Sequence, residues 1–162
     1  MYGTRSGNAV GREGTIGMAW AHDGIFQNNT QTELVDSFQV NAAFQHFWTP
    51  TLRSSVFGGV AGVNYDDDAA LLFCTGANGT ASKVTLTRCD PDFRVYQFGH
   101  RTIWNPVRNL DIGVEVLYTR LDQRHEGDWA LAANGSRAGG LYEARDQSTW
   151  SGVFRVQRNF WP

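Results

Sequence analysis

The feature that most constrains the fold of this chain is an alternation of side-chain character with a period of two. It is clearest in residues 95–121, VYQFGHRTIWNPVRNLDIGVEVLYTRL, where two alternating runs flank an Asn-Pro turn. Because successive side chains of a β-strand point to opposite faces, both runs are predicted to be strands. One face carries aromatic and β-branched residues, whereas the other carries Gln97, Arg101 and Glu115. A dry core would not readily accept that second face.

Six alternating segments are predicted along the chain, with no strong helical periodicity and no linker. Their approximate ranges are 15–21, 35–48, 52–65, 95–104, 110–121 and 149–160. Small residues blur the parity of the third segment, and its expected apolar face consists of Phe57, Gly59, Ala61, Val63 and Tyr65. Residues 1–14 are expected to form an irregular N-terminal segment.

The predicted connections alternate in length. Residues 49–51 and 105–109 form short turns, whereas the third and fourth segments, and the fifth and sixth, are joined by loops of roughly 25 residues, longer than is usual in compact domains. The long loops fall on every second connection, so they share one end of the sheet. Short turns at one rim and long loops at the other are typical of outer-membrane barrels.

Aromatic residues gather at both ends of the predicted strands. Those at the short-turn ends are Trp48, Trp104 and Phe160, and those at the long-loop ends are Tyr65, Tyr96, Tyr118 and Trp150. The two groups are about ten residues apart, which matches the 9–11 residues of a membrane β-strand. Aromatic girdles mark both interfaces of such barrels, whereas a soluble sandwich would favour aromatics in the middle of its core face.

These observations predict an all-β fold, an antiparallel transmembrane β-barrel whose apolar face meets lipid. The residues expected to face a water-filled lumen are Gln97, Arg101, Glu115, Arg155 and Gln157. About six strands are fewer than the eight of the smallest bacterial barrels, and open edges are not tolerated in lipid. Residues 15–162 are therefore expected to be the C-terminal portion of a larger barrel.

Composition and motifs argue against several other function classes, including nucleic-acid binding and catalysis. The net charge of −2 gives no basic footprint for nucleic acid. No nucleophile motif such as G-x-S-x-G accompanies the four histidines, so we expect no enzyme, and we expect neither a metal site nor a cofactor. The mean hydropathy is −0.38, and no apolar run approaches the length of a membrane helix. The start of the chain lacks the apolar region of a signal peptide.

The two cysteines, Cys74 and Cys89, lie in a polar stretch rich in Gly and Thr. They are too few for a four-ligand zinc site. A disulfide between them is predicted, and closing a loop of about 15 residues would stabilise the fold by roughly 3 kcal/mol. Such a bond implies an oxidising compartment, and two free thiols are the alternative.

Four stretches carry a family resemblance. Three are HFWTPTLRSSVFGG, WNPVRNLDIGVEVLYTRLD and STWSGVFRVQRNFWP, and the fourth, IGMAWAHDGIF, is similar to a strand and loop of the same family. The first three resemble the C-terminal region of the alphaproteobacterial porins of the rhizobial and Brucella type. The resemblance implies a 16-stranded, trimeric barrel that crosses the outer membrane and passes small hydrophilic solutes. Family members begin with a signal peptide and an N-terminal half bearing a constriction loop, and we expect neither in this chain. The last strand, which ends near Phe160, also resembles the signal that the barrel-assembly machinery reads.

The resemblance therefore implies a fragment of a passive diffusion channel for small solutes and ions, with outer-membrane lipid as its surroundings. In such a lumen, Arg101 and Arg155 would set ion preference, with Glu115 opposing them; the alternative is that they are ordinary solvated residues. Two other readings stay open. One is a soluble β-sandwich that binds sugars by stacking on Trp48, Trp104 or Trp129, and the other is a truncated porin remnant without transport.

Overall fold

The computed structural model describes residues 14–26, 31–75, 84–131, 133 and 138–160. Apart from Gly14, the segment 1–14 that we expect to be irregular lies outside these ranges. The elements are β1 (Thr15–Ile16), β2 (Gly24–Ile25), β3 (Glu33–Thr49), β4 (Leu52–Tyr65), α1 (Asp67–Thr75), β5 (Val84–Arg88), β6 (Phe93–Val107), β7 (Leu110–Gln123), β8 (Glu126–Leu131), β9 (Gly140–Ala144) and β10 (Gln147–Arg158). Within the described ranges, no helix has the length and apolar character needed to span a membrane.

The chain divides into two compact units. Unit 1 consists of residues 1–38, 61–95 and 121–147, and unit 2 consists of residues 39–60, 96–120 and 148–162. The long strands β3, β4, β6 and β7 contribute residues to both units.

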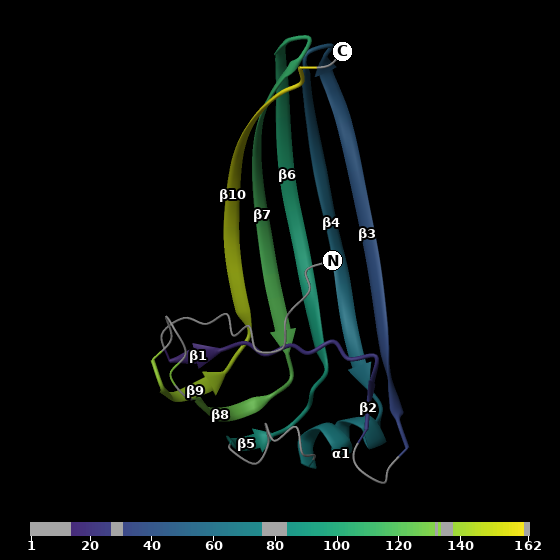
Figure 1. Ribbon diagram of the computed structural model, residues 1–162, viewed down its shortest axis with the longest axis vertical. Helices are drawn as coiled ribbons and strands as arrows, with labels where there is room; N and C mark the ends of the chain where they lie inside the picture. The colour runs from purple at the N-terminus through teal and green to yellow at the C-terminus, as the bar shows by residue number, and fades with distance from the viewer. Residues whose placement is uncertain (1–13, 27–30, 76–83, 132, 134–137, 161–162) are drawn as a thin grey trace. The chain divides into compact units, whose positions relative to one another are not determined.

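Unit 2 is built from five long strands that lie side by side in the order β10-β7-β6-β4-β3 (Figure 1). Two-residue turns connect β3 to β4 and β6 to β7, so each of these pairs runs antiparallel. The sequences of β3, β6, β7 and β10 alternate with a period of two, which favours strands, whereas small residues blur the alternation in β4. The prediction of an all-β, antiparallel, porin-like fold is confirmed.

Contacts between neighbouring strands assign the two faces of unit 2. Tyr118 packs against Trp150, and the ring N–H of Trp48 donates to Ser54 Oγ over 3.1 Å. The even-numbered residues therefore share one side, which we call the apolar face. On the odd-numbered side, which we call the polar face, Gln97 Nε2 donates to Thr119 Oγ1 over 3.2 Å. The parity predicted for β3, β6, β7 and β10 holds.

The parity predicted for β4 is wrong in unit 2. Ser54 contacts Thr102 on the apolar face, whereas Phe57 lies on the polar face, where the guanidinium of Arg101 stacks over its ring. Phe57 occupies the space that Gly99 leaves, because a Cβ added at Gly99 would come within 2.5 Å of the Phe57 ring. The small residues of β4 blur its parity in the sequence, so alternation alone does not identify the apolar face of this strand.

No hydrophobic side chain is buried among the described residues of unit 2. Large apolar side chains are instead exposed along the apolar face: Val40, Phe44, Trp48, Val56, Tyr96, Phe98, Trp104, Val114, Val116, Trp150, Phe154 and Val156. On the polar face the exposed large apolar residues are Phe47, Val107 and Val153. A single sheet that has one apolar face and no second layer packed on it cannot form a hydrophobic core in water.

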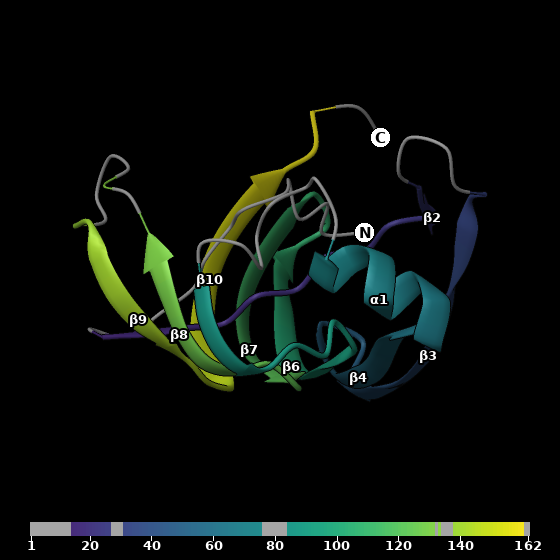
Figure 2. The same ribbon diagram turned by 90° about the horizontal axis from the view of Figure 1, so that it is seen from below.

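Unit 1 contains the hydrophobic core. One cluster is formed by the buried residues Ile25, Val63, Tyr65, Ala69, Phe73 and Phe93, and a second by Ile16, Met18, Trp129 and Ala144. Trp20 packs against both clusters. A four-stranded sheet in the order β1-β9-β8-β5 belongs to this unit, as does α1 (Figure 2). The cores here are small and rich in aromatic rings, with Trp20 and Phe73 at 5.2 Å between centroids.

Tyr65 belongs to the core of unit 1. Its side chain is 8% exposed, and its hydroxyl donates to the carbonyl of Trp20 over 2.6 Å and lies 3.2 Å from His22 Nδ1. Its backbone N–H donates to Asp92. The expectation that Tyr65 forms part of an aromatic girdle is therefore wrong, because a buried ring cannot contact the headgroup region of a bilayer.

The disulfide between Cys74 and Cys89 is confirmed, and it joins the last turn of α1 to the residue that follows β5. The helix itself was not predicted. Asp66 caps it, since its carboxylate accepts the Ala69 backbone N–H at 2.7 Å, and Asp67 and Asp68 occupy the first turn, where the helix dipole favours acidic residues.

Candidate functional site

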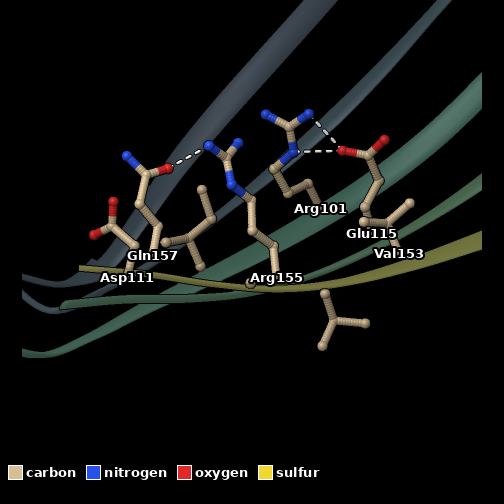
Figure 3. Close-up of a pocket in the computed structure, with 9 residues that line it drawn as sticks. Arg101, Asp111, Glu115, Val153, Arg155 and Gln157 are labelled. Carbon is tan, nitrogen blue, oxygen red and sulfur yellow. Dashed lines mark hydrogen bonds and ion pairs between the residues drawn. The ribbon is translucent and has the colours of Figure 1, made fainter. Parts of the chain in front are cut away.

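A pocket of about 240 Å³ lies on the polar face of unit 2 (Figure 3). Three adjacent strands supply its walls: β6, β7 and β10. Its lining residues are Arg101, Ile103, Asp111, Gly113, Val114, Glu115, Val153, Arg155 and Gln157. Its volume is below the range of about 300–1,000 Å³ that is typical of sites for drug-sized ligands.

The alternation of the strands explains how these residues come together. Eight of the nine have odd numbers, and each strand contributes successive odd positions to one face. β7 lies between β6 and β10, so its Gly113 forms the floor between the longer side chains of its neighbours. Because Gly113 has no side chain, it leaves this floor open.

Arg101 and Glu115 form an ion pair across β6 and β7. The Nε and an Nη atom of the guanidinium both contact a single carboxylate oxygen of Glu115, Oε2. Half of the Arg101 side chain is exposed, so solvent screens the pair and it contributes at most about 1 kcal/mol to stability. Its main effect is to neutralise one cation of the pocket.

Arg155 and Asp111 have uncharged partners. Arg155 donates to the amide oxygen of Gln157, and Gln157 in turn donates to Asn159. Asp111 accepts a hydrogen bond from Nδ2 of Asn105, and the Oδ1 atom of the same amide accepts one from Arg53. Among the described residues, neither Arg155 nor Asp111 forms an ion pair. The pocket thus presents one cation and one anion that are not neutralised by a direct partner.

Four of the five residues predicted to face the lumen line this pocket: Arg101, Glu115, Arg155 and Gln157. Gln97 shares their face but lies outside the pocket, bonded to Thr119. Asp111 and Gly113 were not singled out from the sequence. Their odd numbers could have identified them, since they share the parity of Glu115 on β7.

Comparison with known protein families bears on this site. A sequence model of the porin subfamily matches residues 10–153, which is most of the chain. The chain belongs to the porin subfamily. Porins form outer-membrane channels, which is in keeping with a sheet that has one apolar and one charged face. A search of the curated proteins and a search of the solved structures each found no significant match.

The other residues predicted to form the aromatic girdles lie on the apolar face or just after β10. Trp48, Tyr96, Trp104 and Trp150 are exposed on the apolar face, and Tyr118 lies against Trp150 at 4.9 Å between ring centroids. Phe160 follows β10 and is exposed, with the guanidinium of Arg158 over its ring. These positions are compatible with contact to a bilayer interface, which stays a prediction.

One of the four histidines is buried in unit 1. His125 is 3% exposed and packs among Trp20, Phe73 and Trp129. Burial lowers the pKa of His125 to about 4, partly opposed by the nearby Asp90 carboxylate. Its Nδ1 accepts the backbone N–H of Asp90, so the neutral ring carries its proton on Nε2. The environment is therefore apolar, which suits a structural residue better than a catalytic base.

Proposed function

We propose that this chain forms part of the wall of a water-filled channel in the bacterial outer membrane. Small hydrophilic solutes and ions would diffuse passively through it, down their gradients. The apolar face of unit 2 would contact lipid and the polar face, with its charged pocket, would face the lumen. Porin-subfamily membership supports a channel of this general kind.

The observation that carries the proposal is the absence of a buried hydrophobic side chain among the described residues of unit 2. In water, a sheet that exposes Phe44, Phe98 and Phe154 on one continuous face would aggregate or pair with another layer. In a bilayer the same face is satisfied by acyl chains. The opposite face, which carries Arg101, Glu115 and Arg155, is then satisfied by water.

Within the part of the chain that the structure describes, the two edges of the six-stranded sheet leave backbone groups unpaired, so the channel wall needs further strands. Among the described residues, the outer edge of β10 pairs with no strand, and β2 pairs with β3 only at Glu33 and Leu34. Unpaired backbone groups are not tolerated in hydrocarbon. We therefore propose that further strands close the barrel, and that a completed barrel assembles as a trimer. Recognition of β10 by the barrel-assembly machinery is part of the same proposal.

A soluble β-sandwich that binds sugars is the second candidate, and the structure gives it little support. Such a fold would cover the apolar face with a second sheet, and none is present in the described part of unit 2. Trp129, one of its three stacking residues, is 1% exposed and lies in the core of unit 1. A truncated remnant without transport differs from the proposal only in whether it conducts.

The test is to refold the chain in detergent and to follow it by gel mobility with and without heating, together with conductance across a planar lipid bilayer. The proposal predicts a compact species whose mobility shifts on heating and which produces stable conductance steps when several copies of the chain together supply the strands that close a pore. A compact species that gives no steps would show that this chain is an incomplete barrel and would contradict transport by it alone. A chain that stays monodisperse without detergent would contradict the membrane location.

A further inference from the structure

Two opposite charges line the pocket on the polar face without neutralising each other. Arg155 extends from β10 and is held by the Gln157 amide, whereas Asp111 extends from the adjacent β7 and is held by the Asn105 amide. The other two charges of the pocket, Arg101 and Glu115, pair with one another. The lining is therefore neutral as a whole but retains one available cation and one available anion.

This arrangement selects among ligand classes. A simple anion would gain contact with Arg155 but would be repelled by Asp111, and a simple cation would meet the reverse situation. A small solute that carries both charges can satisfy both groups at once. The pocket volume of about 240 Å³ is sufficient for a small solute of this kind.

We propose that this pocket is a transient binding site for small zwitterionic solutes of the amino-acid class. The carboxylate of the solute would accept hydrogen bonds from the Arg155 guanidinium, whose fork matches a carboxylate. Its ammonium group would donate to Asp111. Gly113 lines the same pocket two residues after Asp111 on β7, and its missing side chain leaves room for the short carbon chain of the solute.

The geometry also indicates weak, rapidly reversible binding. Figure 3 shows Arg155, Gln157 and Asp111 rising from the strands on the same side of the sheet, and the Arg155 side chain is exposed. Exposed ion pairs are worth little because water screens them, so we expect half-saturation in the millimolar range. A site along a diffusion path must release its solute as readily as it binds it. The proposal rests on the proposed function for its biological meaning, although binding can be measured without conductance.

The test uses the refolded chain in detergent, with the Nε–H groups of its arginines observed by ¹⁵N NMR. Glycine, sodium acetate and methylammonium chloride are titrated separately at constant ionic strength. We expect glycine to shift the Arg155 signal in a saturable manner, at about one-fifth of the acetate concentration, because it adds one exposed ion pair. Methylammonium should leave the Arg155 signal unchanged. Equal or unsaturable shifts with glycine and acetate would overturn the proposal.

Two variants sharpen the result. Asp111→Asn removes the partner of the ammonium group, so glycine and acetate should become equally effective. Arg158→Gln is the matched control, since Arg158 lies on the same strand but has the opposite parity, over the Phe160 ring. A glycine preference that survives Asp111→Asn would contradict the site. Saturable binding without conductance would refute the proposed transport and leave the site standing, whereas conductance without saturable binding would do the reverse.

Discussion

The guanidinium carbon of Arg101 lies 5.8 Å from the centre of the Phe57 ring on the polar face of unit 2. This contact places an aromatic residue of β4 under the charged residues of β6. Phe57 fits there because Gly99, on the adjacent strand β6, has no side chain: a Cβ at Gly99 would lie 2.5 Å from the ring. Phe57 and Gly99 are therefore a complementary pair of large and small residues.

Replacing Gly99 tests this pairing. We expect Gly99→Ala to destabilise the refolded protein by about 1–3 kcal/mol, because the added methyl group overpacks against Phe57. In a Phe57→Ala background the same change should cost much less. Urea unfolding of the four proteins in the cycle measures the coupling. Gly113→Ala is the matched control, since its nearest neighbour would lie at an ordinary 3.6 Å, and a similar cost at both glycines would contradict the pairing.

Charge substitutions in the pocket should change ion preference in opposite directions. Glu115→Gln leaves Arg101 without its carboxylate and should favour anions, whereas Arg155→Gln removes the cation that has no carboxylate partner and should favour cations. A unit charge at close range in water is worth about 1 kcal/mol, so each permeability ratio should change by up to about fivefold. Reversal potentials in a KCl gradient measure this. Shifts of the same sign in both variants would argue against a lumenal location.

The disulfide should stabilise unit 1. Cys74→Ser opens a link across 15 residues of sequence, which is worth roughly 3 kcal/mol in the chain-entropy model. We expect a reducing agent to lower the unfolding midpoint of the unmodified protein to that of the variant. The variant itself provides the control, because its midpoint should be unaffected by reduction. Equal midpoints for all four samples would show that the bond adds no stability.

Stability should fall with acidity through His125. The folded pKa of about 4 lies below the ordinary value of 6.5, so the unfolded state binds the proton more readily. The contribution of His125 is complete above about pH 6.5 and is lost as the pH falls towards 4, at up to 1.36 kcal/mol per pH unit. Unfolding measured between pH 6.5 and 5 avoids most carboxylate titration. His125→Phe should flatten this slope, and an unchanged slope would exclude His125 as its source.

Much of the fold could be predicted because apolar and polar residues alternate along a long strand whose two faces meet different environments. The range 52–65 matches β4 at both ends, and the segments that became β3, β6, β7 and β10 were located to within a few residues. The disulfide was predicted correctly as well. Unit 1 was harder, because β5, β8 and β9 are short and lie in loops whose composition resembles a connection. Of the predicted segment 15–21, only Thr15 and Ile16 form a strand.

The errors have local physical causes. α1 spans only Asp67–Thr75, too short for periodicity to stand out, although the capping Asp66 was a usable signal. Tyr65 was predicted to belong to the aromatic girdle at the long-loop end of its strand, but it packs against Phe73 of α1, with 5.8 Å between ring centroids. Such packing depends on where a loop folds back, and the alternation of residues within a strand gives no information about that. The pocket charges followed from parity, whereas their hydrogen-bond partners required the structure.

The most direct test of the account is the accessibility of adjacent residues on β7 to quenchers that favour lipid or water. Spin labels would be placed one at a time at positions 113, 114, 115 and 116, with the native disulfide intact, and the protein reconstituted in lipid vesicles. The account predicts that labels at Val114 and Val116 are reached preferentially by oxygen dissolved in the bilayer, and labels at Gly113 and Glu115 by a water-soluble nickel complex. Equal access of the nickel complex to all four labels would contradict the claim that one face of this sheet meets lipid and the other meets water.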